Sequence, residues 1–172
     1  MNQKVKSCIV ISLVLVSFVL ISIRVIFVNK KAYSVLPPKL YRIGDIFEYD
    51  GMQMQLSDYK IYKGEELNSQ YNNELSDIID EYDILFNLTI TNVSNTVKQY
   101  NASASGMMYG YESGGNVNPY LYQYFNQNTK GIISLEKDES KTVTLAFPID
   151  VSNENIEYVV SLYPENIRVK LK

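Results

Sequence analysis

The sequence predicts an all-β protein: an antiparallel β-sandwich or barrel with one short helix, preceded by a single N-terminal transmembrane helix. Two observations support this prediction. Short segments of the C-terminal part alternate apolar and polar residues between turn residues, which is typical of strands with one buried face. Residues 9–28, by contrast, contain sixteen Ile, Val, Leu or Phe, which is the composition of a membrane-spanning helix.

The charges divide along the same line. The 172 residues carry 16 basic and 19 acidic side chains, a net charge of −3. Five of the basic residues and none of the acidic ones lie in residues 1–31, so residues 32–172 have 11 basic and 19 acidic side chains and a net charge of −8. Such an acidic domain is repelled by phosphate backbones, which argues against nucleic acid as a partner.

Residues 7–28 are interpreted as an uncleaved signal anchor. As a helix this stretch is about 33 Å long, against roughly 30 Å of hydrocarbon in a bilayer. Ser22 and Ala32 lack a small residue two positions earlier, so neither marks a good cleavage site. Residues 1–6 are then a short cytoplasmic head. This predicts a single-pass protein of the cell membrane with an extracytoplasmic C-terminal domain, although basic residues flank the run on both sides.

Residues 29–42 are interpreted as a linker and residues 43–172 as the sandwich domain. Pro37 and Pro38 disfavour helix and favour an extended spacer. In the domain, Asp50-Gly51 predicts a hairpin turn. Leu85 interrupts the polar side of the strongest strand pattern, at 82–91, so this strand is expected to be buried on both faces.

One segment has helical spacing instead. Its apolar residues recur every three or four positions; they are Leu67, Tyr71, Leu75, Ile78, Ile79 and Tyr82. The sequence therefore predicts a short helix near 69–80.

The inventory of reactive side chains is small. There is no His, and the one Cys, Cys8, lies at the start of the apolar run. Ser-His-Asp triads, Cys-His pairs and His-based zinc sites are therefore excluded. Ser134 and Lys137 match a Ser-x-x-Lys pattern, but Lys141-Thr142-Val143 lacks the glycine of its usual partner strand. We expect no catalytic residues and no cofactor.

An acidic stretch from Glu65 to Asp83 has no basic residue between Lys63 and Lys98. Its carboxylates are of the kind that calcium prefers, but their spacing matches no EF-hand loop. We therefore interpret it as a solvated surface and predict no metal site.

The candidate binding site is the segment 101–131. It holds only two charged residues, Glu112 and Lys130, among many Asn, Gln, Ser and Gly. Tyrosine with small polar residues is the mixture that antibody binding loops use. We expect strands at Met107–Tyr111 and Tyr120–Phe125 around a Gly114-Gly115-Asn116 turn. The candidate partner-binding residues are Tyr109, Tyr111, Tyr120, Tyr122 and Tyr124. The alternative is that these tyrosines pack against the domain itself.

The order of motifs also resembles a known group. An opening Ile43-Gly44-Asp45, a strand ending in Thr91-Asn92-Val93-Ser94, and a loop Leu135–Ser140 before a strand ending in Phe147-Pro148 resemble the telokin-like, immunoglobulin-fold modules of Gram-positive surface proteins. Lys137-Asp138 stands where Pro-Gly is common in those modules. The resemblance covers roughly residues 42–172 and implies an immunoglobulin-like antiparallel β-sandwich; it implies no activity.

Together these features favour a membrane-anchored interaction module that binds a protein partner or a cell-wall component. The alternative is an accessory or immunity-type subunit that acts on another membrane protein through its helix and outer domain.

Overall fold

The computed structural model describes residues 14–26, 37–109, 113–152, 155–162 and 165–172. The chain forms two compact units, residues 1–37 and residues 38–172. In the first, residues 14–26 are helical, and Ser22 Oγ donates a hydrogen bond to the Phe18 carbonyl over 2.9 Å. Within the described residues no helix has both the length and the apolar character needed to cross a bilayer. The expected transmembrane helix, 7–28, extends outside the described residues at both ends.

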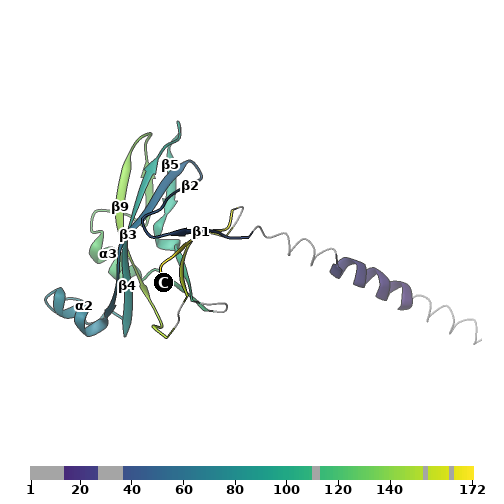
Figure 1. Cartoon of the computed structure of the whole chain (residues 1–172), viewed down its shortest axis with the longest axis horizontal. Coiled ribbons are helices and arrows are strands. Elements are labelled where there is room, and N and C mark those ends of the chain that lie inside the picture. The colour runs from purple at the N-terminus through teal and green to yellow at the C-terminus, as the bar shows by residue number, and fades with distance from the viewer. Residues whose placement is uncertain (1–13, 27–36, 110–112, 153–154, 163–164) are drawn as a thin grey trace, which may run out of the picture. The chain divides into compact units, whose positions relative to one another are not determined.

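The second unit is a β-sandwich (Figure 1). One sheet has the order β1 (Lys39–Arg42), β11 (Ile167–Lys170), β10 (Ile156–Ser161), β6 (Gly106–Tyr109) and β7 (Ser113–Asn116). The other has the order β2 (Ile46–Tyr49), β3 (Met52–Lys63), β4 (Tyr82–Asn92) and β9 (Ser140–Pro148). A small third sheet pairs β5 (Lys98–Asn101) with β8 (Ile132–Leu135). The helices here are α2 (Gly64–Gln70), α3 (Pro119–Phe125) and the 3₁₀ turn η1 (Ala102–Ala104).

Two expectations about the start of the domain need correction. Lys39–Arg42, expected to be the end of the 29–42 linker, forms β1. This strand runs parallel to β11, with Lys39 opposite Ile167. The sequence predicted a purely antiparallel sandwich, and this pair of strands departs from that prediction. The long chain between the two strands permits this pairing, because parallel neighbours require a crossover connection rather than a tight turn.

The expected hairpin is confirmed. Asp50 and Gly51 both have positive φ, 49° and 71°, which is the geometry of the two-residue turn that matches strand twist. The turn joins β2 to β3, with Phe47 opposite Met54.

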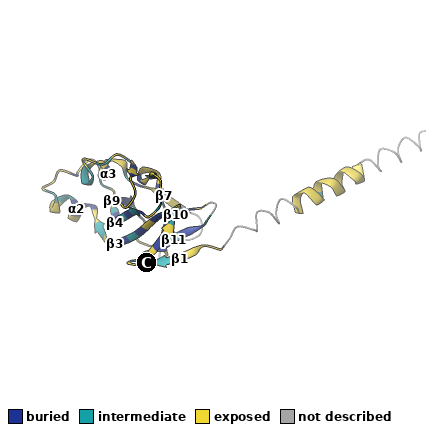
Figure 2. Ribbon diagram, turned by 90° about the horizontal axis from the view of Figure 1, so that it is seen from above, coloured by how far each residue is buried: buried dark blue, intermediate teal, exposed yellow. Residues whose placement is uncertain are grey.

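The core lies between the two large sheets (Figure 2). Phe86 of β4 stacks on Phe147 of β9 with ring centroids 5.7 Å apart, and Tyr158 of β10 meets Phe86 edge-on at 5.1 Å. The expectation that β4 is buried on both faces is confirmed: Phe86 faces this core, and Leu85 is buried in a second apolar cluster on the other face.

The helix predicted near 69–80 lies elsewhere. The helix is α2, Gly64–Gln70, and residues 71–78 form turns. Asn72 and Asn73 have φ of 55° and 61°, a left-handed conformation that stops a helix and that Asn tolerates. Leu67 and Leu75 are nevertheless both buried against Leu85. The helical spacing therefore reflected a shared buried side, not one continuous helix.

Candidate functional site

The segment 101–131 folds differently from the expected strand–turn–strand. Tyr120–Phe125 is part of helix α3. Asn118 begins this helix: its side-chain oxygen accepts hydrogen bonds from the Tyr120 and Leu121 backbone N–H groups at 3.1 and 3.2 Å. Pro119 follows at the first helical position, where its fixed φ suits a helix and its missing N–H is not needed.

The expected turn at Gly114-Gly115-Asn116 is instead strand β7, which pairs with β6 from Gly106↔Asn116 to Tyr109↔Ser113. The candidate Tyr111 lies outside the described residues. Strand β6 itself was expected, as part of Met107–Tyr111.

Two of the candidate tyrosines are buried. Tyr109 is 8% exposed and Tyr122 is 4% exposed. The Tyr109 hydroxyl donates to the Pro148 carbonyl, and the Tyr122 hydroxyl donates to the Lys130 carbonyl over 3.0 Å. Burial raises the pKa of both phenols. These two side chains hold the domain together, as the packing alternative requires.

The other two described candidates lie nearer the solvent. Tyr120 is 65% exposed. Tyr124 is half-buried; its ring meets Tyr71 edge-on at 6.0 Å, and its hydroxyl donates to Glu74 Oε2 over 2.7 Å, which raises the pKa of the phenol. Of the four described candidates, Tyr120 is thus the one whose ring is free to meet a partner.

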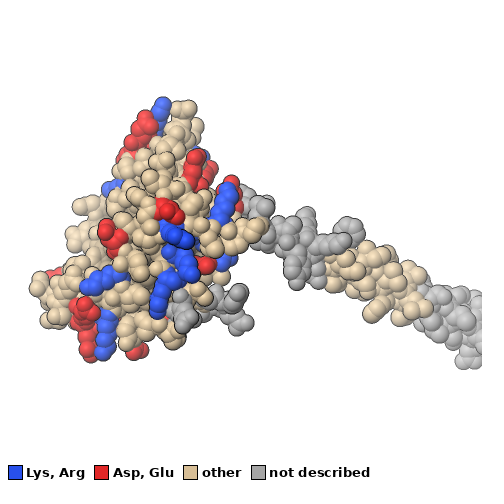
Figure 3. Space-filling model, viewed as in Figure 1, with Lys and Arg blue, Asp and Glu red and all other residues tan. Residues whose placement is uncertain are grey.

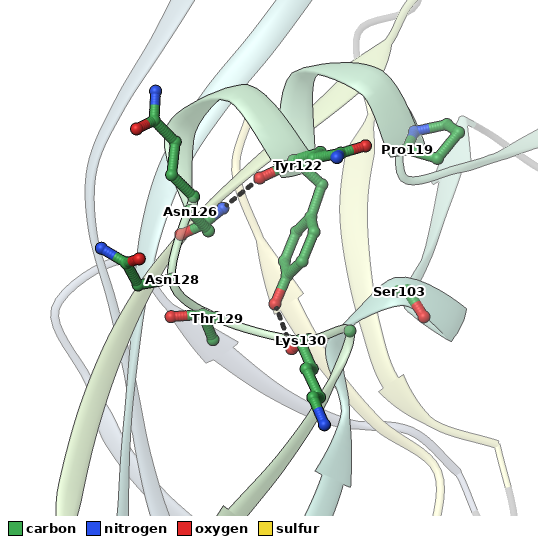
Figure 4. Close-up of a pocket in the computed structure, with 10 residues that line it drawn as sticks. Ser103, Pro119, Tyr122, Asn126, Asn128, Thr129 and Lys130 are labelled. Atoms are coloured by element: carbon green, nitrogen blue, oxygen red, sulfur yellow. Dashed lines mark hydrogen bonds between the residues drawn. The ribbon is translucent and has the colours of Figure 1, made fainter.

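A pocket of about 540 Å³ opens beside the buried face of α3 (Figure 4). Its wall comes from η1, from α3 and from the loop that leads to β8. The described residues that line it include no carboxylate, and their one charged group is Lys130. The lining residues are Ser103, Pro119, Tyr122, Gln123, Asn126, Gln127, Asn128, Thr129, Lys130 and Gly131.

Asn126 fixes one side of the pocket to the sandwich. Its side-chain amide donates to the Thr144 carbonyl over 2.8 Å and accepts from the Thr144 N–H over 2.9 Å. The amide thus pairs with the edge of β9 as a neighbouring strand does. It also donates to the Tyr122 carbonyl over 2.8 Å, so the end of α3 is tied directly to the sheet.

The opposite side is fixed by a close backbone approach. The Gly131 carbonyl accepts from the Ala102 N–H over 2.8 Å. A Cβ at Gly131 would lie 2.6 Å from Ser103 Oγ, so this contact requires a residue without a side chain. Figure 4 shows Tyr122 reaching from α3 to Lys130 between these two sides.

The sequence marked this segment as unusual through its tyrosines, whereas the pocket wall is formed mainly by its amide side chains. The signal for the pocket was the run Asn126-Gln127-Asn128-Thr129 directly after the helix. That run has no charge and no apolar residue, and it makes up much of the pocket wall.

The other chemical motifs give no assembled site in the described residues. Ser134 lies on β8 and Lys137 in the following turn, both exposed, so the Ser-x-x-Lys pair does not open a helix. No three or more described His, Cys, Asp or Glu side chains form a group that could hold a metal ion. In the acidic stretch, Glu65 and Glu66 lie 3.9 and 3.5 Å from Lys63 and Lys60.

Asp83, also in that stretch, is fully buried. Its Oδ2 accepts the Asp80 N–H over 3.0 Å, while Oδ1 has no hydrogen-bond partner among the described residues. Burial, reinforced by the nearby Asp80 charge, raises the pKa of this carboxyl to about 6.

On the face drawn in Figure 3, basic side chains form one run near the middle of the domain, with acidic side chains at its margins and elsewhere on the face. Exposed pairs such as Lys39–Glu165, at 2.8 Å, fit this arrangement. A pair of this kind contributes little to stability.

Comparisons with known proteins bear on the fold. No family model matches the chain, and no curated protein matches it. Solved structures do. The YjhA protein of Bacillus subtilis aligns with a TM-score of 0.54 at 13% identity, covering 77% of this chain and 99% of that one. A conserved hypothetical protein of Bacillus anthracis aligns at 0.53 and 10% identity, covering 77% and 95%.

The secreted protein MPT63 of Mycobacterium tuberculosis aligns with a TM-score of 0.51 at 12% identity, covering 79% of this chain and 98% of that one. At these identities the likeness shows a shared fold and carries no activity from one protein to another. The β-sandwich predicted from the sequence is confirmed.

Proposed function

We propose that this chain is a non-catalytic, extracytoplasmic binding module of the telokin-like, immunoglobulin-fold kind, held at the cell membrane by residues 7–28. The observation that carries the proposal is the pocket beside α3, whose described lining has Lys130 as its one charged group, together with the exposed Tyr120 on the same helix. Pockets that bind small ligands combine a concave wall with a few placed polar groups.

The support for a tether is the composition of residues 7–28, which are uncharged apart from Arg24. The support for a binding role is the way the surface around α3 is built. The side chains of Asn126 and Asn118 donate hydrogen bonds to backbone carbonyls of the domain, and these bonds fix the helix. Tyr120 and the loop amides remain at the surface. A rigid support under adaptable polar contacts lowers the entropic cost of binding.

The test is site-specific crosslinking on living cells. A photoreactive phenylalanine derivative replaces Tyr120 in the full-length chain, and a second strain carries it at Tyr59, which is 40% exposed on β3. We expect discrete adducts, protein or wall polymer, at position 120 and not at position 59. Equal labelling at both positions, or none at either, would contradict a partner surface at α3.

A stability control accompanies this experiment. Tyr120→Ser removes a ring that is mostly in solvent, so the free energy of unfolding should change by less than about 0.5 kcal/mol. A larger loss in denaturant unfolding would mean that Tyr120 serves packing, as Tyr122 does.

A further inference from the structure

We infer that the pocket beside α3 binds an uncharged saccharide of about two sugar rings. This inference names the ligand class of the proposed binding module and rests on that proposed function.

The amide side chains of the pocket wall suit the hydroxyl groups of a sugar. Gln123, Gln127 and Asn128 are at the solvent-exposed side of the pocket, and each planar amide offers two N–H donors and one acceptor oxygen. Adjacent hydroxyl groups of a sugar are also donors and acceptors at once. Such amides therefore satisfy paired hydroxyls without requiring a charge on either side.

The charges of the pocket and of the domain favour an uncharged ligand. No carboxylate is found among the described residues of the wall, and Lys130 is the one cation there. An anionic ligand must approach a domain whose residues 32–172 carry a net charge of −8, and that field opposes it. An uncharged ligand escapes both this repulsion and the desolvation of a charge.

The pocket wall suits a saccharide better than a peptide. Peptides are held by sheet edges or by grooves that take apolar side chains. Here Asn126 occupies the β9 edge at Thr144. Of the carbon-rich residues of the wall, Tyr122 is only 4% exposed and Pro119 is exposed. The accessible apolar surface is therefore small, and suits one edge of a sugar ring rather than several peptide side chains.

The volume of the pocket and the rigidity of its wall also suit a small ligand. A volume of about 540 Å³ falls within the roughly 300–1,000 Å³ typical of small-molecule sites. The wall is held in place by the Asn126 contacts to Thr144 and by the Tyr122–Lys130 hydrogen bond. Little ordering is then required on binding.

The experiment uses the full-length chain in a detergent without a sugar headgroup. N,N′-diacetylchitobiose and cellobiose are two uncharged disaccharides, with and without acetamido groups, and binding is followed by saturation-transfer NMR. We expect transfer to the protons of at least one of them. A Q123A/N128A variant should bind it at least tenfold more weakly, because two of the three exposed amides of the pocket are gone.

The matched control is Q70A/N95A, which removes one Gln and one Asn from exposed positions outside the pocket and should bind like the parent. Q127A, with a single truncation, is a second pocket variant should the double variant unfold. No transfer to either disaccharide, or equal loss in the pocket and control variants, overturns the inference. If Tyr120 still crosslinks to a protein in that case, the binding module stands and the saccharide alone is rejected.

Discussion

Asp83 is a buried carboxyl group whose two oxygens have different surroundings: Oδ2 accepts the Asp80 N–H, and Oδ1 has no partner among the described residues. Its pKa of about 6 lies above the ordinary 3.8 because burial penalises the charged form. Well below pH 3.8 the group is neutral in both the folded and unfolded states. Between pH 4 and pH 6 the unfolded state loses its proton first, so folding becomes less favourable as the pH rises.

Asp83→Asn should remove this pH dependence. Relative to the parent, the variant should gain about 2 kcal/mol of unfolding free energy between pH 4.5 and pH 7, since the parent must hold a buried charge at the higher pH. Urea unfolding at both values measures the difference. Asp77→Asn, at an exposed position, serves as the control. A gap between D83N and the parent that stays constant with pH would show that Asp83 is not responsible.

The tyrosines of segment 101–131 show what residue type alone can predict about a binding surface. Their number and their polar neighbours marked segment 101–131 correctly as unusual, but side-chain composition does not separate a buried ring from an exposed one. Tyr122 and Tyr120 are two positions apart on the same helix, and only Tyr120 faces solvent. That division depends on which side of α3 meets β9, which is a tertiary contact.

At the scale of elements, α3 is the clearest departure from the sequence-based expectation. Alternating Tyr120, Tyr122 and Tyr124 suggested a strand, but Asn118 and Pro119 begin a helix. Asn118 caps the helix and also donates to the Ile78 carbonyl over 2.8 Å. It thereby joins the turn before β4 to the helix that carries the pocket.

Asn118→Ala should therefore lower the free energy of unfolding by about 1–3 kcal/mol, because the helix loses its cap and the Ile78 carbonyl loses a donor. Asn128→Ala, which truncates an exposed amide on the same segment, should change it by less than about 0.5 kcal/mol. Thermal and denaturant unfolding of the two variants make the comparison. Equal effects would mean that the Asn118 contacts contribute nothing specific.

The prediction of a helix near 69–80 was wrong for a related reason. Leu67 and Leu75 have helical spacing because both cover Leu85 on the outer face of β4. Turns can place two residues on one side of a segment as well as a helix does. The left-handed conformation of Asn72 and Asn73 makes this segment a series of turns rather than a helix. An Asn-Asn pair in a sequence does not by itself predict that conformation.

At the scale of the whole molecule, the proposed tether makes a prediction about topology. Protease added to intact cells should remove residues 38–172, since the proposal places this unit outside the membrane. A cytoplasmic protein serves as the control for cell integrity, and lysed cells show that the unit is cleavable. Complete protection in intact cells, with cleavage after lysis, would place the domain on the other side of the membrane.

The sequence by itself determined the sandwich class, the Asp50-Gly51 hairpin and the double burial of β4. Each depends on local chemistry: alternation of apolar residues, a turn pair that accepts positive φ, and an extra Leu on the polar face. Tertiary structure alone decided that Lys39–Arg42 joins the sheet, that α3 is a helix, and that the amides of residues 123–128 line a pocket. These features depend on contacts between residues far apart in the chain, such as Lys39 with Ile167 and Asn126 with Thr144.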